Sequence, residues 1–267
     1  MQHNFKKTLL VSALALIGAT AHMAYAEEAA PAAEAAAAEP VDTLAYNVGV
    51  VSEYRYRGIS QSRFDPALQG GVDFTSKDGW YIGTWLSSID WIKDSSTSTI
   101  KVKGPVEWDL YGGYRGEIAT DLTYDVGYLR YEYAGNTLAK LGTSANANTD
   151  EIYGALTYKL FTAKYSYSLD NLFGFEKSQG SGYIDLSLNL DLGDGYSLVP
   201  HVGHQTVAKN GFESYSDYAL TLGKDFGNGF SATAAAIGTD AKTGAYVSPN
   251  GKNLGKSNLV VGVKYTF

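Results

Sequence analysis

The chain has 267 residues, among them 21 tyrosines and 30 glycines, no cysteine, and a formal net charge of −7. The absence of cysteine excludes a disulfide scaffold and cysteine-based metal or nucleophile chemistry. The acidic balance argues against a nucleic-acid-binding protein, and the mean hydropathy of −0.17 is too polar for a bundle of transmembrane helices.

Residues 1–26 have the layout of a secretory signal peptide. Two lysines at positions 6 and 7 precede an apolar stretch, and Ala24-Tyr25-Ala26 forms a small-x-small cleavage site. The alternative is a membrane anchor, but the apolar stretch is shorter than the roughly 20 residues that span a bilayer. We therefore expect an exported protein, with the Ala-, Glu- and Pro-rich residues 27–43 as a periplasmic tail.

From Leu44 onward, apolar and polar residues alternate at period two. Within 183–192 every even position is Ile or Leu and the odd positions are mostly polar. This pattern is typical of a β-strand with one face in an apolar medium and the other in a polar one. We predict twelve such strands: 44–56, 66–75, 80–90, 106–117, 121–133, 150–160, 162–170, 182–192, 196–206, 215–226, 230–239 and 257–267.

The links between these segments alternate between short turns and long loops. An even number of strands with this layout is typical of outer-membrane barrels of Gram-negative bacteria, whose short turns face the periplasm. The predicted fold class is therefore all-β: a transmembrane antiparallel β-barrel of about 12 strands over residues 44–267, with both termini periplasmic. The alternative is a soluble β-sandwich or a secreted lectin-like domain, because periodicity does not say which face is wet. Aromatic residues at the predicted strand ends favour the barrel in lipid.

Three segments near the start of the predicted barrel carry a resemblance to a known family. They are Ser-Glu-Tyr-Arg-Tyr-Arg-Gly-Ile-Ser-Gln at 52–61, Pro-Ala-Leu-Gln-Gly-Gly-Val-Asp-Phe at 66–74, and Gly-Trp-Tyr-Ile-Gly-Thr-Trp-Leu-Ser-Ser-Ile-Asp at 79–90. They resemble the TorF-type porin family of proteobacterial outer-membrane β-barrels. The resemblance implies an outer-membrane barrel with pore activity and no particular substrate.

The C-terminal Tyr265-Thr266-Phe267 is similar to the aromatic-x-Phe ending of outer-membrane proteins that the barrel-assembly machinery reads. A free strand edge with an apolar face can be captured by strand addition. Tyr265 and Phe267 are therefore the predicted assembly signal. The alternative is a β protein that simply ends in Phe, but Phe267 is in phase with the apolar face of its strand.

The same phase places ten acids and five bases on the inner face of the barrel. These residues would line a weakly cation-favouring aqueous pathway. The other possibility is that the charges pair and fill a narrow barrel, since twelve strands lie between packed and open barrels. The acids are Glu53, Asp73, Glu107, Asp109, Asp125, Glu151, Asp170, Asp185, Asp191 and Asp217, and the bases are Arg55, Arg115, Lys159, Lys164 and Lys264.

The expected function is an outer-membrane porin or narrow channel for the passive passage of small hydrophilic solutes. The alternative is a closed structural barrel, or one that binds a ligand or partner, without a continuous pore. Expected partners are outer-membrane lipid, lipopolysaccharide near the lysine-rich loops, the barrel-assembly machinery and the solutes. Arg55, Arg57 and Arg63 would bind an anionic solute if they cluster, or else meet lipopolysaccharide phosphates or pair with Glu53 and Asp65.

No enzyme, cofactor or metal site is expected. His201 and His204 are three residues apart on one strand, so they face opposite sides and cannot form a joint metal site. The sequence has no G-x-S-x-G, no H-E-x-x-H and no phosphate-binding glycine loop.

Overall fold

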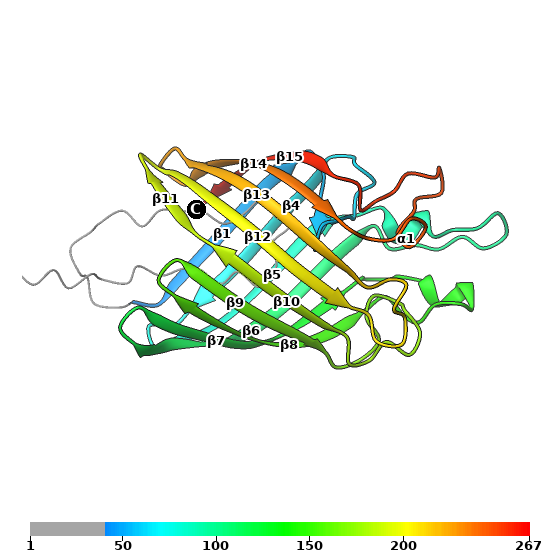
Figure 1. Ribbon diagram of the computed structural model, residues 1–267, viewed down its shortest axis with the longest axis horizontal. Helices are drawn as coiled ribbons and strands as arrows, with labels where there is room; N and C mark the ends of the chain where they lie inside the picture. Colours follow the sequence, from blue (N-terminus) through cyan, green and yellow to red (C-terminus); the bar gives the residue numbers. More distant parts are fainter. Residues whose placement is uncertain (1–40) are drawn as a thin grey trace, which may run out of the picture.

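The computed structural model describes residues 41–267 (Figure 1). The predicted signal peptide at 1–26 and nearly all of the predicted tail at 27–43 lie outside the described residues. Among residues 41–267, no helix is long and apolar enough to cross a membrane.

The strands form one antiparallel wall that closes on itself. Its sheet contains thirteen strand segments. Two of them, β10 (Gly182–Leu188) and β11 (Leu190–Gly193), are parts of one strand, because both pair with β12 (Tyr196–Thr206). The wall therefore has twelve strands. It closes because β1 (Thr43–Val51) pairs with both β4 (Ala67–Thr75) and β15 (Asn258–Thr266). The remaining strands are β5 (Trp80–Ser88), β6 (Val106–Ala119), β7 (Leu122–Glu132), β8 (Thr149–Tyr158), β9 (Phe161–Ser168), β13 (Tyr215–Asp225) and β14 (Phe230–Thr239).

The predicted segments coincide with the twelve strands of this wall, so the predicted antiparallel barrel of twelve strands is confirmed. One boundary differs by more than two residues. The first segment, predicted to run to residue 56, leaves the wall after Val51, and β2 (Arg55–Tyr56) pairs only with β3 (Ile59–Ser60). Arg57 and Gly58 between them have φ values of 45° and 79°. Two successive positive φ angles make a tight hairpin turn, which ends the extended strand.

Both ends of the barrel chain lie together at the end where the short turns are (Figure 1). The backbone N–H of Tyr46 donates to the carbonyl oxygen of Phe267 at 2.9 Å, and the N–H of Phe267 donates back to Tyr46 at 2.9 Å. The turn before β14 needs glycine, since a Cβ on Gly229 would lie 2.0 Å from the carbonyl oxygen of Thr266 and its φ is +81°. We call this the turn end and the opposite end the loop end.

The two faces of the wall differ in polarity. Outward residues are apolar and exposed along every strand, as shown by Leu259, Val261 and Val263 on β15. Aromatic rings, among them Trp80 and Phe230, are exposed at the turn end. The alternate inward positions carry most of the charges, hydroxyls and glycines described below. An apolar outside and a polar inside are the arrangement of a barrel that spans a bilayer.

The long loops pack together as a cap at the loop end. The cap includes the short helix α1 (Trp91–Asp94) and the 3₁₀ helix η1 (Leu138–Leu141) (Figure 1). Ile92, Leu138 and Ala147 are buried in one apolar cluster with inward residues of the wall. The loops are therefore held over the lumen by an apolar core that they share with the inner wall.

Candidate functional site

The β2–β3 hairpin, with the residues that flank it, crosses the lumen beneath the cap. Tyr54 packs edge-to-face on Trp85 of β5, with ring centroids 5.4 Å apart, and its hydroxyl donates to Glu107 of β6 at 2.7 Å. The hydroxyl of Tyr56 lies 2.6 Å from the hydroxyl of Tyr131 on β7. The first side of the hairpin therefore contacts three consecutive wall strands.

Arg57, at the tip of the hairpin, reaches the far wall. Its guanidinium donates two hydrogen bonds to the Glu151 carboxylate on β8, at 2.8 and 3.1 Å, and a third to the side-chain oxygen of Gln205 on β12 at 2.6 Å. It also lies 4.2 Å over the ring of Tyr183 on β10. The fork of a guanidinium matches a carboxylate in this bidentate geometry, which makes the contact directional.

The tip also touches the wall beyond these strands. A Cβ placed on Gly58 would lie 2.5 Å from the Cγ2 atom of Thr239 on β14 and 2.8 Å from the Cβ of Asp217 on β13. Arg55 pairs with Glu53 at 2.7 Å. The hairpin therefore runs from the β5 side of the barrel to the β14 side, and it fills the lumen at this level.

The loop that returns from the hairpin is attached to the cap. Arg63 donates to both carboxylate oxygens of Asp94 in α1, each at 2.5 Å. Burial raises the pKa of the Asp94 carboxyl above its ordinary value, and the hydrogen bonds from Arg63 act in the opposite direction. Backbone contacts add to this anchor, because the N–H of Ser60 donates to the carbonyl of Leu254 at 3.0 Å.

Below the hairpin, inward tyrosines lie along the wall instead of crossing the lumen. A Cβ on Gly83 would fall 2.4 Å from the ring of Tyr111, and a Cβ on Gly127 would fall 2.4 Å from the hydroxyl of Tyr153. Glycine is required at these sites because the rings occupy the space of a side chain. Tyr111 and Tyr153 therefore lie against the wall and do not cross the bore here.

Charged side chains of both signs follow one another around this lower wall. Tyr111 donates to Asp73 and Tyr81 donates to Asp125, each at 2.5 Å, while the ring of His201 lies 3.1 Å from Asp185. Three further acids lie on the inner face near the turn end. The lower wall thus has six inward acids (Asp73, Glu117, Asp125, Asp185, Asp191 and Asp225) and three inward bases (Arg115, Lys164 and Lys264).

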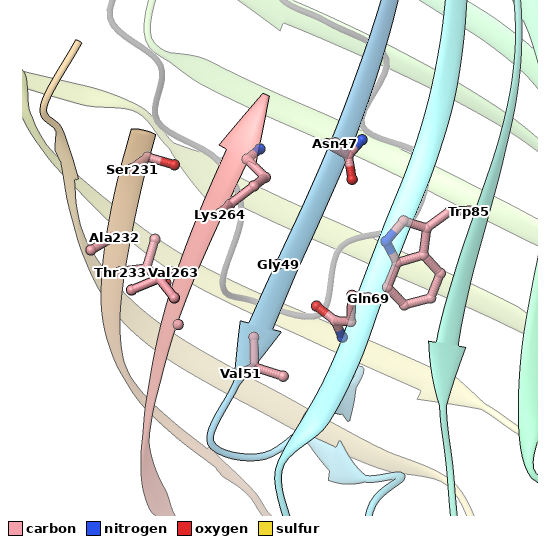
Figure 2. Close-up of a pocket in the computed structure, with 11 residues that line it drawn as sticks. Asn47, Gly49, Val51, Gln69, Trp85, Ser231, Ala232, Thr233, Val263 and Lys264 are labelled. Atoms are coloured by element: carbon pink, nitrogen blue, oxygen red, sulfur yellow. The ribbon is translucent and has the colours of Figure 1, made fainter. Parts of the chain in front are cut away.

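One side of the lower lumen is recessed. Figure 2 shows this recess between β14, β15, β1, β4 and β5, and the recess is partly open. Glycines at 49 and 262 leave room there, and the polar lining is almost entirely neutral, with Lys264 as its only base. The lining includes Asn47, Gln69, Trp85, Ser231, Thr233 and Lys264.

Most predicted inner-face residues lie inside the barrel, but four positions differ from the prediction. Glu53 and Arg55 lie in the hairpin segment and not on a wall strand. Lys159 is exposed in the turn between β8 and β9, with φ of 55°, so its prediction as an inner-wall residue is wrong. The alternation does not continue through this turn, because Tyr158 and Phe161 are its closing pair. The others on the inner wall are Asp73, Glu107, Asp109, Arg115, Asp125, Glu151, Lys164, Asp185, Asp191, Asp217 and Lys264, while Asp170 follows the end of β9.

The three arginines of the first loop do not form one anion-binding cluster. Arg55 pairs with Glu53, Arg57 with Glu151, and Arg63 with Asp94. Sequence reasoning missed the contact between Arg57 and Glu151, since these residues are 94 positions apart. The available signal was the Arg57-Gly58 dipeptide, which favours a turn inside an apparent strand.

Histidines and acids give no metal centre in the part of the chain that the structure describes. His201 is buried inside the barrel and His204 is exposed outside, as the spacing predicted. No group of three or more His, Asp or Glu residues within 41–267 is arranged to hold a metal ion.

Residues 34–267 match the family model described as "Bacterial protein of unknown function (Gcw_chp)". The chain belongs to the Gcw_chp family. No curated protein matches this Gcw_chp member by sequence. Among solved structures, it is similar to the NanC porin (12% identity, TM-score 0.51, covering 84% of this chain and 99% of that one). It is also similar to the KdgM porin (6% identity, TM-score 0.50, covering 85% and 99%). At these identities the similarity shows a shared porin-type barrel fold.

Proposed function

We propose that this protein is an outer-membrane porin, a narrow channel through which small hydrophilic solutes pass passively. The observation that carries the proposal is a closed twelve-stranded wall with apolar side chains outside and charged side chains inside. Such a wall places its outer face in hydrocarbon and its inner face in water. The fold shared with two porins supports it, as does the resemblance of residues 52–90 to TorF-type porins.

A weak preference for cations is part of the proposal. Six acids face three bases on the inner wall below the hairpin, and rings of charge set the selectivity of such pathways. Glu117 is the clearest test position, because it lies near the turn end, inward-facing and exposed. Glu117→Gln should shift the reversal potential in a KCl gradient toward zero, whereas Glu176→Gln in an outer loop should not.

The proposed setting is the outer membrane of a Gram-negative bacterium, after removal of residues 1–26. The turn end, with both chain ends, would face the periplasm, and the loop lysines would meet lipopolysaccharide and anionic lipid. Tyr265 and Phe267 would be read by the barrel-assembly machinery. In support, Phe267 stacks on Tyr46 of β1 with ring centroids 5.6 Å apart, so the last residue helps to seal the barrel.

The experiment is planar-bilayer conductance of the full-length gene product, purified from outer membranes. Discrete current steps with a reversal potential that favours cations are the expected result. A second candidate function, a closed barrel that binds a ligand or partner, is favoured by one observation: the hairpin fills the lumen at the loop end. A folded, inserted protein that never conducts would support that second candidate and overturn the first.

A further inference from the structure

We propose that the β2–β3 hairpin is the gate of this channel and that the ion pair between Arg57 and Glu151 is its latch. This inference rests on the proposed function, since a gate requires a pathway. A movable hairpin lets a barrel whose upper lumen is filled conduct through its charged lower lumen.

The first argument is how the hairpin is attached. It leaves the wall after Val51 and returns at Ala67, and these two residues are themselves paired across β1 and β4. The hairpin strands form hydrogen bonds with each other and belong to no wall sheet. Ser52 is still bonded to Val261 of β15. Residues 53–66 can therefore move about this closed base while every strand pair of the wall stays intact.

The second argument is the chemistry of the contacts with the far wall. Arg57 is 7% exposed and Glu151 is 2% exposed, so both charges of this pair have lost their water. A buried ion pair recovers its desolvation cost only partly, and well-packed apolar residues would hold a permanent plug at least as firmly. When the hairpin moves, Arg57 and Glu151 regain water, which offsets part of the cost of separating them. An ion pair at this contact therefore suits a segment that moves between two positions.

The third argument is local strain and the connection to the cap. Arg57, Arg63 and Phe64 all have positive φ, at 45°, 57° and 67°, although none of them is glycine. Such backbone costs free energy and persists where neighbouring contacts impose it. The outer contacts of this segment, from Ser60 and Arg63, go to loops of the cap. The hairpin therefore moves together with the loops of the cap. The hydrogen bonds of Arg57 are its main polar contacts with the far wall.

A disulfide lock tests the gate directly, because the chain has no cysteine of its own. Gly58→Cys with Thr239→Cys joins the tip to β14: a Cβ on residue 58 would lie 2.5 Å from the Thr239 Cγ2 atom, which the second substitution removes, and the reduced protein shows what crowding at the tip does by itself. The matched control is Thr221→Cys with Ala235→Cys, which joins two directly paired inward residues of β13 and β14 and leaves the hairpin alone. Each protein is recorded in a bilayer after oxidation and again after addition of a reductant.

Glu151→Gln tests the latch and does not depend on conductance alone. Loss of one partner leaves Arg57 buried without a counter-charge, so we expect the open fraction to rise about tenfold or more. A second readout is the rate at which a water-soluble thiol reagent labels Gly58→Cys in the folded barrel, with and without Glu151→Gln. Heat-dependent migration in gels verifies that each variant is a folded barrel.

Three outcomes decide the matter. Currents that vanish in the oxidised lock, return on reduction and persist in the oxidised control support the gate. Equal currents from the oxidised and reduced lock overturn it, because solutes then bypass the hairpin. If no variant conducts, the proposed function fails. The labelling rate of residue 58 then tests the movement of the hairpin without conductance. Faster labelling in the Glu151→Gln background supports this movement, and an unchanged rate refutes it.

Discussion

The pairing of inward tyrosines with glycines gives a prediction that can be worked out in numbers. A Cβ on Gly203 of β12 would lie 2.1 Å from the hydroxyl oxygen of Tyr183 and 2.8 Å from a carboxylate oxygen of Asp217. Tyr183 donates to that carboxylate at 3.0 Å. Gly203→Ala must therefore push the Tyr183 ring off the wall and stretch or break this hydrogen bond.

The expected cost has two parts. Overpacking of a tight site costs about 1–3 kcal/mol, and a hydrogen bond to a charged group contributes about 1.5–3 kcal/mol. Because the two effects share one side chain, they do not add fully. We expect Gly203→Ala to lower the free energy of unfolding by about 2–4 kcal/mol.

The assay is urea unfolding of the barrel in lipid vesicles, followed by tryptophan fluorescence. The control is Gly154→Ala, another glycine inside a wall strand, where an added Cβ meets only Val126 Cγ1 at 3.9 Å. That variant should lie within about 0.5 kcal/mol of the wild type. A Gly203→Ala protein as stable as Gly154→Ala would refute the steric reasoning.

Three other predictions test the contact between the C-terminal residue and β1, the outer surface of the barrel, and the orientation of the barrel in the membrane. Deletion of Phe267 removes its ring stack on Tyr46 and both backbone hydrogen bonds between them, so we expect fewer folded barrels in outer membranes, counted by heat-dependent gel migration. Leu220→Arg places a charge halfway along the exposed outer face of β13 and should cost about 2–4 kcal/mol in the same urea titration, unless that face does not contact lipid. Protease added to intact cells should cut the loop at 240–256 and spare the tail at 27–42; cutting confined to the tail would contradict the proposed orientation.

The alternation of apolar and polar residues determined the barrel. Residues 183–192 show why: a strand turns successive side chains to opposite faces, so a period of two encodes which face meets apolar surroundings. The turns carry a local signal as well, since Gly227, Asn228 and Gly229 all adopt positive φ angles, which glycine and asparagine tolerate best. For these reasons strand number and strand positions could be predicted, and the structure confirms them.

What fills the lumen depends on contacts between residues far apart in the sequence, which no local sequence pattern encodes. Residues 52–56 alternate like a strand, yet they leave the wall because Arg57 finds Glu151 and Gln205, which are 94 and 148 positions away. Tyr153 lies flat on the wall because Gly127, on another strand, gives it room. Pairing between distant residues depends on the closed geometry of the barrel. The sequence by itself therefore determined the wall and its two faces, whereas only the tertiary structure decided that the hairpin fills the upper lumen and that the inward tyrosines below it lie along the wall.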